Sequence, residues 1–396
     1  MESVVQIILK PGKDAPVRRF HPWVFSGAIA KVFGKPQDGE VVEVVDHQKN
    51  YLATGHYHEG SITVKLFSFE PITPDADFWF KRLEKALRVR QALQFTNTTC
   101  YRLVHGEGDG FPGLILDWYN GVVVFQGHSV GMHRERESIT QALQTLYGDQ
   151  LLGVYDKSHE TLPDRYAQSV QNGYLWQKET ISLPHPVLEN GHTFLIDWQT
   201  GQKTGFFLDQ RENRQLLTKY VKGKRVLNAF CYSGGFSIYA LSAQASLVHS
   251  VDVSEKAIRL VEQNVAANHE GGQPTHEAYA EDVMKYLKTH DQQYDVVVLD
   301  PPAYAKSMDA RHRAVQGYKR LNIEGLKRLA PGGILFTFSC SQVVDRELFY
   351  NTIVAAAIEA GRQVRVLHHL SQGPDHPVNF FHPEGHYLKG LVLYVE

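Results

Sequence analysis

The sequence predicts an α/β fold whose C-terminal half holds a doubly wound parallel sheet. From about residue 190, short continuous apolar runs alternate with helical patterns. Residues 1–70 instead contain short apolar runs punctuated by Gly and Pro, which predicts an all-β segment. The length of 396 residues suits two or three domains of roughly 100–200 residues each. We therefore expect three domains, over residues 1–70, 71–190 and 191–396.

The composition excludes several functional classes. A hydrophobic fraction of 43% and a charged fraction of 21% are ordinary for a globular protein. A formal net charge of −2 is not the basic balance of a non-specific nucleic-acid binder. Three scattered cysteines form no disulfide framework, and neither a signal peptide nor a transmembrane run is recognisable. We expect a cytoplasmic enzyme with no membrane partner.

The first segment carries apolar runs at residues 4–9, 41–45 and 62–69, which predict a small closed or half-closed barrel. It also carries basic residues close to His21 and Trp23. A basic cluster with aromatics suits an RNA surface, but a solvated face beside a packed tryptophan fits equally well. The basic residues are Lys10, Lys13, Arg18 and Arg19.

The second segment predicts an α+β unit. Asp75 or Asp77 is placed to cap a helix that carries Trp79, Leu83 and Leu87 on one face. Asn120-Gly121 is a strong hairpin signal between two strands. The expected strands cover residues 101–104, 114–117, 122–126 and 151–155, and a second helix covers residues 134–146.

The third segment predicts a parallel sheet with helices on both faces, because its strands are short, continuously apolar and separated by helices. The expected strands cover residues 225–230, 247–251, 296–299 and 334–338, and the clearest helices cover residues 236–242 and 255–268.

The carboxyl ends of these strands carry the residues expected of a ligand site. Gly234 and Gly235 follow the first strand, Asp252 ends the second, and Asp282 begins a helix. Taken singly, the glycines fit an ordinary strand-to-helix turn and Asp282 fits a plain N-cap. Together they favour a nucleoside-bearing ligand. Because G-x-G-x-x-G and the phosphate loop are both missing, S-adenosylmethionine fits better than NAD.

The fourth strand ends in Asp300-Pro301-Pro302, followed by Tyr304. The two prolines donate no hydrogen bonds and rigidify the strand exit, and the tyrosine is placed to stack on a flat base. This stretch resembles motif IV of class I methyltransferases, (D/N)PP(Y/F). The third segment is therefore expected to be a Rossmann-like class I methyltransferase domain.

Over essentially its whole length the chain resembles the ribosomal RNA large-subunit methyltransferase I family. The resemblance implies an N-terminal PUA domain, a central α+β domain and a C-terminal methyltransferase domain that makes 5-methylcytidine in 23S ribosomal RNA. Ala303 departs from the lysine of a DPPK variant. The matching stretches are HPWVFSGAI (21–29), GEGDGFPGL (106–114), KTGFFLDQR (203–211), LNAFCYSGGF (227–236), DPPAY (300–304), FSCS (338–341) and HPEGHYLKG (382–390).

The resemblance also implies site residues and partners. The cofactor is S-adenosylmethionine, and the substrate is 23S ribosomal RNA or a pre-ribosomal particle. The sequence leaves the target nucleotide open, and also whether the enzyme is a homodimer. The implied cofactor-binding residues are Lys203, Thr204, Phe206, Asn228, Phe230, Tyr232, Ser233, Gly234, Asp252, Val253, Asp282, Asp300 and Pro301.

The resemblance makes Cys340 the expected nucleophile, and its position fits, because its strand follows the DPPAY strand and ends near the expected cofactor. A thiolate that adds to carbon 6 of cytosine raises the electron density at carbon 5, which then accepts the methyl group. From position alone, a buried structural cysteine is equally consistent. A base must afterwards remove the carbon 5 proton. Glu384 is the first candidate, with His386 beside it in the same stretch, and Asp300 is the third.

Two other functions remain open. One is an exocyclic-amine methyltransferase of the N6-adenine type, which needs no cysteine. The other is a non-catalytic RNA-binding protein with a decayed methyltransferase domain, against which the intact acids Asp252, Asp282 and Asp300 argue. The 20 histidines are dispersed without metal-ligand spacing, so no metal is expected.

Overall fold

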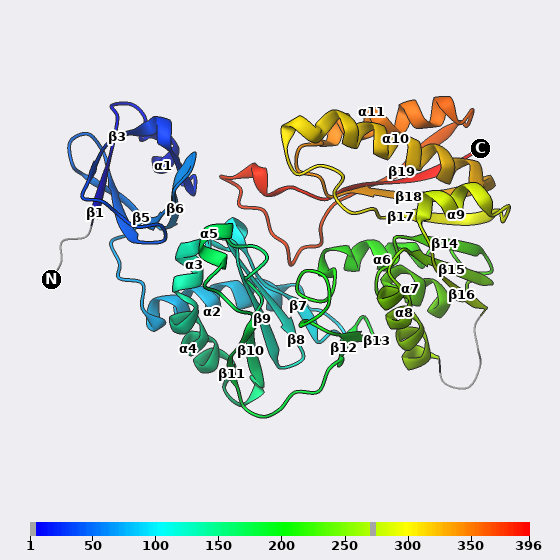
Figure 1. Cartoon of the computed structure of the whole chain (residues 1–396), viewed down its shortest axis with the longest axis horizontal. Coiled ribbons are helices and arrows are strands. Elements are labelled where there is room, and N and C mark those ends of the chain that lie inside the picture. Colours follow the sequence, from blue (N-terminus) through cyan, green and yellow to red (C-terminus); the bar gives the residue numbers. More distant parts are fainter. Residues whose placement is uncertain (1–4, 270–274) are drawn as a thin grey trace. The chain divides into compact units, whose positions relative to one another are not determined.

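The structure, a computed structural model, describes residues 5–269 and 275–396. Residues 1–4 lie outside it, including Val4 of the predicted first strand and the residues in which we expect no signal peptide. Contacts divide the chain into two compact units (Figure 1). Unit 1 comprises Met1–Asn190, Ile196–Leu208 and Pro374–Gly385, and unit 2 comprises Gly191–Leu195, Asp209–Gly373 and His386–Glu396. A division of unit 1 near residue 70 stays a prediction.

Unit 1 begins with the predicted all-β segment. Its described strands form one sheet in the order β2-β6-β5-β4-β1-β3, in which β1 and β4 are parallel. Alternate residues such as Ile7, Val44 and Val64 are buried in its core. The strands are β1 (Val5–Leu9), β2 (Trp23–Phe25), β3 (Ile29–Phe33), β4 (Val41–Val45), β5 (Tyr51–Tyr57) and β6 (Ile62–Ser68), with α1 (Ala15–Arg18) between β1 and β2.

The rest of unit 1 is the predicted α+β region. Its sheet has the order β11-β10-β9-β8-β7. Asp75 caps α2 by accepting a hydrogen bond from the Phe78 N–H at 2.8 Å, and Asn120 and Gly121 turn the β8–β9 hairpin with φ values of 45° and 99°. The elements are α2 (Ala76–Ala92), β7 (Cys100–His105), β8 (Leu114–Tyr119), β9 (Val122–Gly127), α3 (Val130–Arg134), α4 (Arg136–Tyr147), β10 (Gly153–Asp156), α5 (Asp164–Ala167), β11 (Gly173–Gln177) and β12 (His185–Glu189).

Unit 2 contains the predicted doubly wound sheet, with the strand order β16-β15-β14-β17-β18-β20-β19. The strands from β14 to β18 pair in parallel, whereas β20 is antiparallel to both β18 and β19. The elements, after β13 (His192–Ile196), are α6 (Arg211–Leu217), β14 (Arg225–Ala229), α7 (Gly235–Ser242), β15 (Leu247–Asp252), α8 (Glu255–Asn268), β16 (His276–Ala280), α9 (Val283–Thr289), β17 (Tyr294–Leu299), α10 (Arg311–Arg328), β18 (Leu329–Ser339), α11 (Arg346–Glu359), β19 (Val364–Leu370) and β20 (Lys389–Val395).

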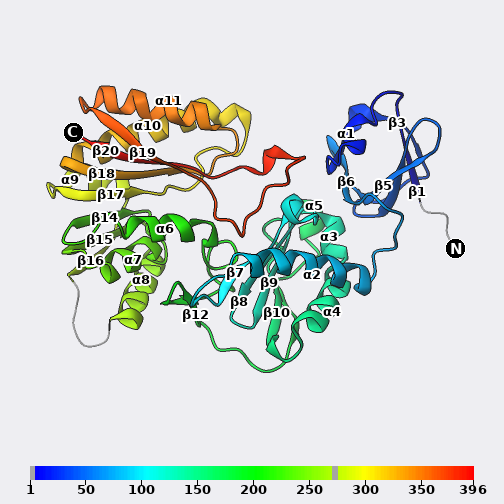
Figure 2. The ribbon, with the colours of Figure 1, turned by 180° about the vertical axis from the view of Figure 1, so that it is seen from behind.

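Helices cover both faces of this sheet (Figure 2). Successive strand residues face opposite layers. Val226 and Val296 pack with α6 and α7, and Leu227 and Val297 pack with α9, α10 and α11. Burial on both faces explains why these strands read as continuous apolar runs.

The strand order reverses between β14 and β17, because the chain builds outward through β15 and β16 and then returns to the other side of β14. A doubly wound sheet binds its ligand beyond the carboxyl ends of the strands at such a point. No helix within the described ranges combines the length and apolarity that crossing a bilayer requires.

Candidate active site

The loop between β14 and α7 has an unusual backbone. Phe230, Tyr232 and Gly234 adopt positive φ angles of 61°, 45° and 79°. The left-handed region costs a non-glycine residue about 1–3 kcal/mol, and such strain persists only where the surroundings enforce it. Here the Cys231 N–H donates to the Val251 carbonyl at 3.1 Å. The loop is thus held in a fixed shape at the predicted cofactor site.

Gly234 could not be another residue without a shift of its neighbour. A Cβ at this position would lie 3.0 Å from a methyl carbon of Val261. Ser233 is anchored by its carbonyl, which accepts a hydrogen bond from the Asn264 amide at 2.8 Å. The close packing of α8 against the loop therefore requires glycine.

Asp252, at the end of β15, ties two loops together. One carboxylate oxygen accepts a hydrogen bond from the Tyr232 N–H at 3.1 Å, and the other accepts one from the Ser254 N–H at 3.0 Å. A carboxylate has about four acceptor positions, so ribose hydroxyls can still donate to this one. The next side chain, Val253, is 73% exposed and able to pack against a base.

Two further predicted cofactor residues have structural partners of their own. The buried Asn228 donates to the Ser237 hydroxyl at 2.8 Å, so this amide supports the start of α7. Asp282 caps α9 by accepting from the Lys285 N–H at 2.9 Å. Burial chiefly raises the pKa of Tyr304, and Tyr318 and then Asp282 add to that increase.

Lys203, Thr204 and Phe206 belong to unit 1. The Thr204 hydroxyl donates to Asp117 at 2.5 Å and contacts the Tyr119 hydroxyl at 3.1 Å. Phe206 is buried. These contacts fix residues 196–208 on β8, and the cofactor role of the three residues stays a prediction.

Asp300 follows β17 in unit 2 and is half-buried, and the buried Pro301 comes after it. The Gln210 amide donates to one Asp300 oxygen at 3.1 Å. Burial first, and then the nearby Asp209 carboxylate, raise the pKa of Asp300 to about 7. Asp300 can therefore exchange a proton at neutral pH.

Asp209 supplies a second carboxylate close to Asp300. One of its oxygens accepts a hydrogen bond from the Tyr387 hydroxyl at 2.6 Å. The other oxygen is buried and has no hydrogen-bond partner among the described residues. A buried acceptor without a donor is costly, so this oxygen is suited to meeting a donor on a ligand.

Cys340 comes directly after β18 and is the least buried of the three cysteines. Burial raises the pKa of its thiol to about 11, and the Asp300 and Asp209 carboxylates add to this effect. Lys389 acts in the opposite direction. Cys231 and Cys100 are buried, and burial raises the pKa of Cys231 well above its usual value.

The remaining base candidates have different surroundings. His386 belongs to unit 2, where burial first and then Arg346 lower its pKa. Glu384 belongs to unit 1, where one of its oxygens lies 3.9 Å from His21 Nε2 and the other 3.7 Å from His382 Nε2. The ligand atoms of these last three residues lie within 4.8 Å of one another and could hold a metal ion, although the sequence predicts none.

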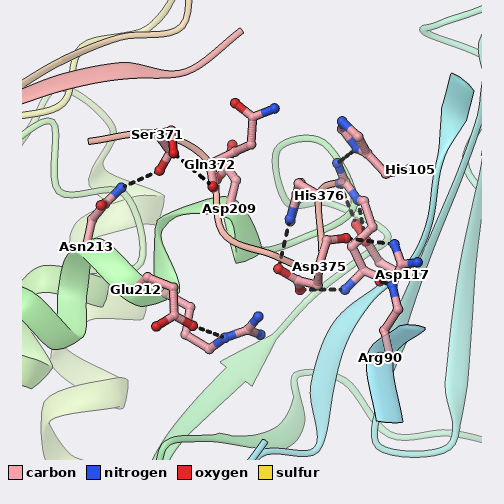
Figure 3. A network of polar contacts seen from close by, with 12 residues as sticks. Arg90, His105, Asp117, Asp209, Glu212, Asn213, Ser371, Gln372, Asp375 and His376 are labelled. Carbon is pink, nitrogen blue, oxygen red and sulfur yellow. Dashed lines mark hydrogen bonds and ion pairs between the residues drawn. The ribbon is translucent and has the colours of Figure 1, made fainter. Parts of the chain in front are cut away.

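A buried polar network fixes the segment that precedes His386 (Figure 3). Within unit 1, Arg90 donates to the Asp375 carbonyl at 2.8 Å, and the Arg102 N–H donates to the Asp375 carboxylate at 3.1 Å. The other Asp375 oxygen lies 3.0 Å from His376 Nδ1. The chain is thus anchored just before the residues that lead into β20.

Sequence reasoning missed Asp209, Gln210 and Lys389 as site residues. All three lie in stretches that carried the family resemblance, KTGFFLDQR and HPEGHYLKG. The available signals were an acid–amide pair after an apolar run and a lysine at the head of the apolar run LKGLVLYV.

Comparisons with known proteins identify relatives over the whole length. Residues 101–380 match the family described as S-adenosylmethionine-dependent methyltransferase, and residues 7–69 match the PUA-like domain. The ribosomal RNA large subunit methyltransferase I of Aeromonas hydrophila is 40% identical over 394 residues, which cover 98% of each chain. The protein of the same name from Escherichia coli is 39% identical over 400 residues, which cover 99% of each chain.

Two solved structures share the fold. One, described as a SAM-dependent methyltransferase from Streptococcus mutans, has a TM-score of 0.83 at 23% identity and covers 99% of this chain and 100% of its own. The other, described as a methyltransferase complexed with SAH, has the same TM-score and coverage at 24% identity. These comparisons confirm the predicted fold class and the cofactor type.

Proposed function

Because the chain belongs to the ribosomal RNA large subunit methyltransferase I family, we propose that it methylates carbon 5 of a cytidine in 23S ribosomal RNA. It is an S-adenosylmethionine-dependent methyltransferase with a PUA-like domain. The proposed substrate is the RNA itself or a pre-ribosomal particle. The reaction is proposed to take place in the cytoplasm, with the enzyme as a monomer or a homodimer.

The surroundings of Cys340 carry the proposal. Cys340 and Asp300 follow β18 and β17, which are neighbouring parallel strands, and the Asp300 carboxylate adds to the increase that burial causes in the pKa of Cys340. A thiol beside a carboxylate with a pKa of about 7 supplies both groups that the reaction needs. The thiolate attacks carbon 6, carbon 5 takes the methyl group, and a base then removes the carbon 5 proton.

Asp300 is the release base that we favour. Its pKa of about 7 means that the carboxylate form, which accepts a proton, predominates above that pH. It belongs to the same unit as Cys340 and interacts with it electrostatically. His386 and Glu384 are retained as alternatives to be compared with it.

Two observations, one for each, argue against the other functions. An exocyclic-amine methyltransferase has no use for a thiol next to its DPPY-type motif. The strained cofactor loop tied to Asp252 argues against a decayed domain, since strained backbone of this kind clusters at active sites and ligand clamps.

RNA binding is proposed for the PUA-like domain. Lys10, Lys13, Arg18 and Arg19 are all exposed. Arg18 already pairs with Asp14 and Asp46, at 2.5 Å and 2.8 Å. Lys10 Nζ donates to the Gly27 carbonyl at 2.9 Å, so Lys13 and Arg19 are the better candidates for contacts with phosphate.

Asp252→Ala is expected to weaken S-adenosylmethionine binding by about 5- to 150-fold, or 1–3 kcal/mol, because ribose donors and the Tyr232 N–H lose their acceptor. Calorimetry measures the affinity, and thermal unfolding checks the fold. Glu255→Ala removes an equal charge from an exposed position three residues further on and should bind normally. Wild-type affinity in Asp252→Ala would refute the assignment.

A further inference from the structure

Three side chains of unit 1 converge although they are far apart in the sequence. His21 lies just before β2, whereas His382 and Glu384 lie in the segment that leads towards β20. Their ligand atoms all lie within 4.8 Å of one another. Glu384 Oε1 lies 3.9 Å from His21 Nε2, and Glu384 Oε2 lies 3.7 Å from His382 Nε2. Within residues 5–269 and 275–396, no other group of three His, Cys, Asp or Glu side chains meets this criterion.

His382 is buried without a hydrogen-bond partner. It is 3% exposed, and neither of its ring nitrogens has a partner among the described residues. Its ring packs against that of Trp23, with the ring centroids 4.2 Å apart. A buried polar atom without a partner is costly, and native proteins contain few of them. The Nε2 atom that lies near Glu384 is therefore suited to bind a ligand that the described residues do not supply.

The separations between the three side chains distinguish a metal site from a hydrogen-bonded cluster. Hydrogen-bonded N···O pairs are about 2.7–3.2 Å apart, so the separations of 3.7 Å and 3.9 Å are too long for hydrogen bonds between Glu384 and the two rings. Zinc binds histidine nitrogen and carboxylate oxygen at about 2.0–2.2 Å in a tetrahedron, so two of its ligands are about 3.4 Å apart. Movements of about half an ångström or less bring both pairs to that spacing.

Neighbouring groups orient the two histidines and the carboxylate. His21 Nδ1 lies 3.3 Å from the Trp23 carbonyl oxygen and 3.2 Å from the Trp23 nitrogen. In the tautomer with a proton on Nδ1, this nitrogen donates to the carbonyl and leaves the Nε2 lone pair free, as in most metal-bound histidines. Trp23 is itself held by a hydrogen bond from its Nε1 to Glu107 at 2.8 Å. A 3₁₀ turn directly after His382 carries Glu384.

We propose that His21, His382 and Glu384 bind one Zn²⁺ ion. Two imidazole nitrogens and one carboxylate oxygen are a ligand set that zinc uses, with a water molecule as the fourth ligand. The Glu384 side chain is 52% exposed, so the ion and this water are accessible from solvent. Mg²⁺ and Ca²⁺ prefer oxygen ligands and are not expected to compete. The ion ties residues 374–385 to the start of β2 within unit 1.

This zinc site goes beyond the proposed methylation and does not depend on it. The sequence predicts no metal because its histidines lack metal-ligand spacing, whereas these ligands come together only through the fold. The site also bears on the release base. A carboxylate that binds zinc is not free to accept a proton, which agrees with the preference for Asp300 over Glu384.

Calorimetry with Zn²⁺ alone tests the site in the full-length protein, after EDTA has removed bound metal and has been dialysed away. The wild type should bind one Zn²⁺ ion per chain, even in excess Mg²⁺. His21→Gln, His382→Gln and Glu384→Gln should each weaken binding by at least about tenfold, because each removes a zinc ligand. His58→Gln is the matched control and should bind zinc like the wild type. His58 is a half-buried histidine of the PUA-like segment that lies 3.3 Å from Asp38 but belongs to no group of three ligands among the described residues.

Cobalt provides a second readout, because the absorption of bound Co²⁺ reports its coordination number and its ligands. The wild type should give the intense visible bands of a four- or five-coordinate ion. It should not give the near-ultraviolet charge-transfer band of a cobalt–thiolate bond. That band would show that Cys100, Cys231 or Cys340 binds the metal, and the assignment would then be wrong.

Glu384→Gln decides the proposal if a histidine variant fails to fold, because its side chain is exposed and the change keeps its size. Thermal unfolding without metal checks each fold, and Zn²⁺ should raise the unfolding temperature of the wild type more than that of Glu384→Gln. Undiminished zinc affinity in Glu384→Gln, an equal loss in His58→Gln, or no zinc binding by the wild type would each overturn the proposal. These measurements use neither RNA nor S-adenosylmethionine, so their failure would leave the methylation proposal standing.

Discussion

Cys340→Ala is expected to abolish methyl transfer to RNA, by about three orders of magnitude or more, while cofactor and RNA binding are retained. Without sulfur at carbon 6, carbon 5 of cytosine is not activated. The substitution removes one atom from a half-buried position, so the fold should persist. Transfer of labelled methyl groups measures activity, and calorimetry measures cofactor affinity.

Cys231→Ala is the matched control for this variant. Cys231 lies in the cofactor loop but is buried, and burial raises the pKa of its thiol well above the usual value. It should keep most of the activity. If Cys340→Ala methylates at a near-normal rate, the cytosine mechanism is wrong, and transfer to an exocyclic amine becomes the better account.

The second large effect concerns release of the product. Asp300→Asn should permit attack and methyl transfer but slow removal of the carbon 5 proton. The methyltransferase motif (D/N)PP(Y/F) accepts Asn at this position, so the strand exit should keep its shape. A covalent protein–RNA complex should then accumulate and survive a denaturing gel. Adding Cys340→Ala to the same variant should remove the complex.

Glu384→Gln and His386→Gln are compared with Asp300→Asn in the same gel. Each removes one of the other candidate bases without changing the size of the side chain greatly. The variant that accumulates the Cys340-dependent complex identifies the base. If only Glu384→Gln or His386→Gln does so, the covalent mechanism stands and the assignment of Asp300 is wrong.

The strands of unit 2 could be predicted because burial on both faces leaves a continuous apolar signal. The runs ending at Ala229, Asp252 and Leu299 show this directly. The antiparallel insertion of β20 between β18 and β19 could not be predicted in the same way. An apolar run such as residues 391–395 does not reveal whether its strand pairs in parallel or antiparallel. In β19, half-buried and exposed residues alternate, so this strand lacks the continuous apolar signal of the others.

The site residues, like the strands, fall into those that a local sequence pattern predicts and those that only long-range pairing brings to the site. Cys340, Asp252 and Asp300 each end an apolar run, so a local pattern was enough to select them. Asp209 and Lys389 were missed because their relation to Cys340 depends on long-range pairing. Lys389 reaches the turn after β18 only because β20 returns alongside it. The spacing of residues along the sequence does not predict that contact.

The central claim is the covalent adduct between Cys340 and the target cytidine, and 5-fluorocytidine tests it most directly. Fluorine takes the place of the hydrogen that the base must remove, so the enzyme can attack and methylate but cannot release the product. Wild-type protein, S-adenosylmethionine and RNA containing 5-fluorocytidine should give a stable complex. Its mass should equal protein plus RNA plus one methyl group, with the link mapped to Cys340. Methylated RNA without a covalent complex, or a link at another residue, would contradict the account.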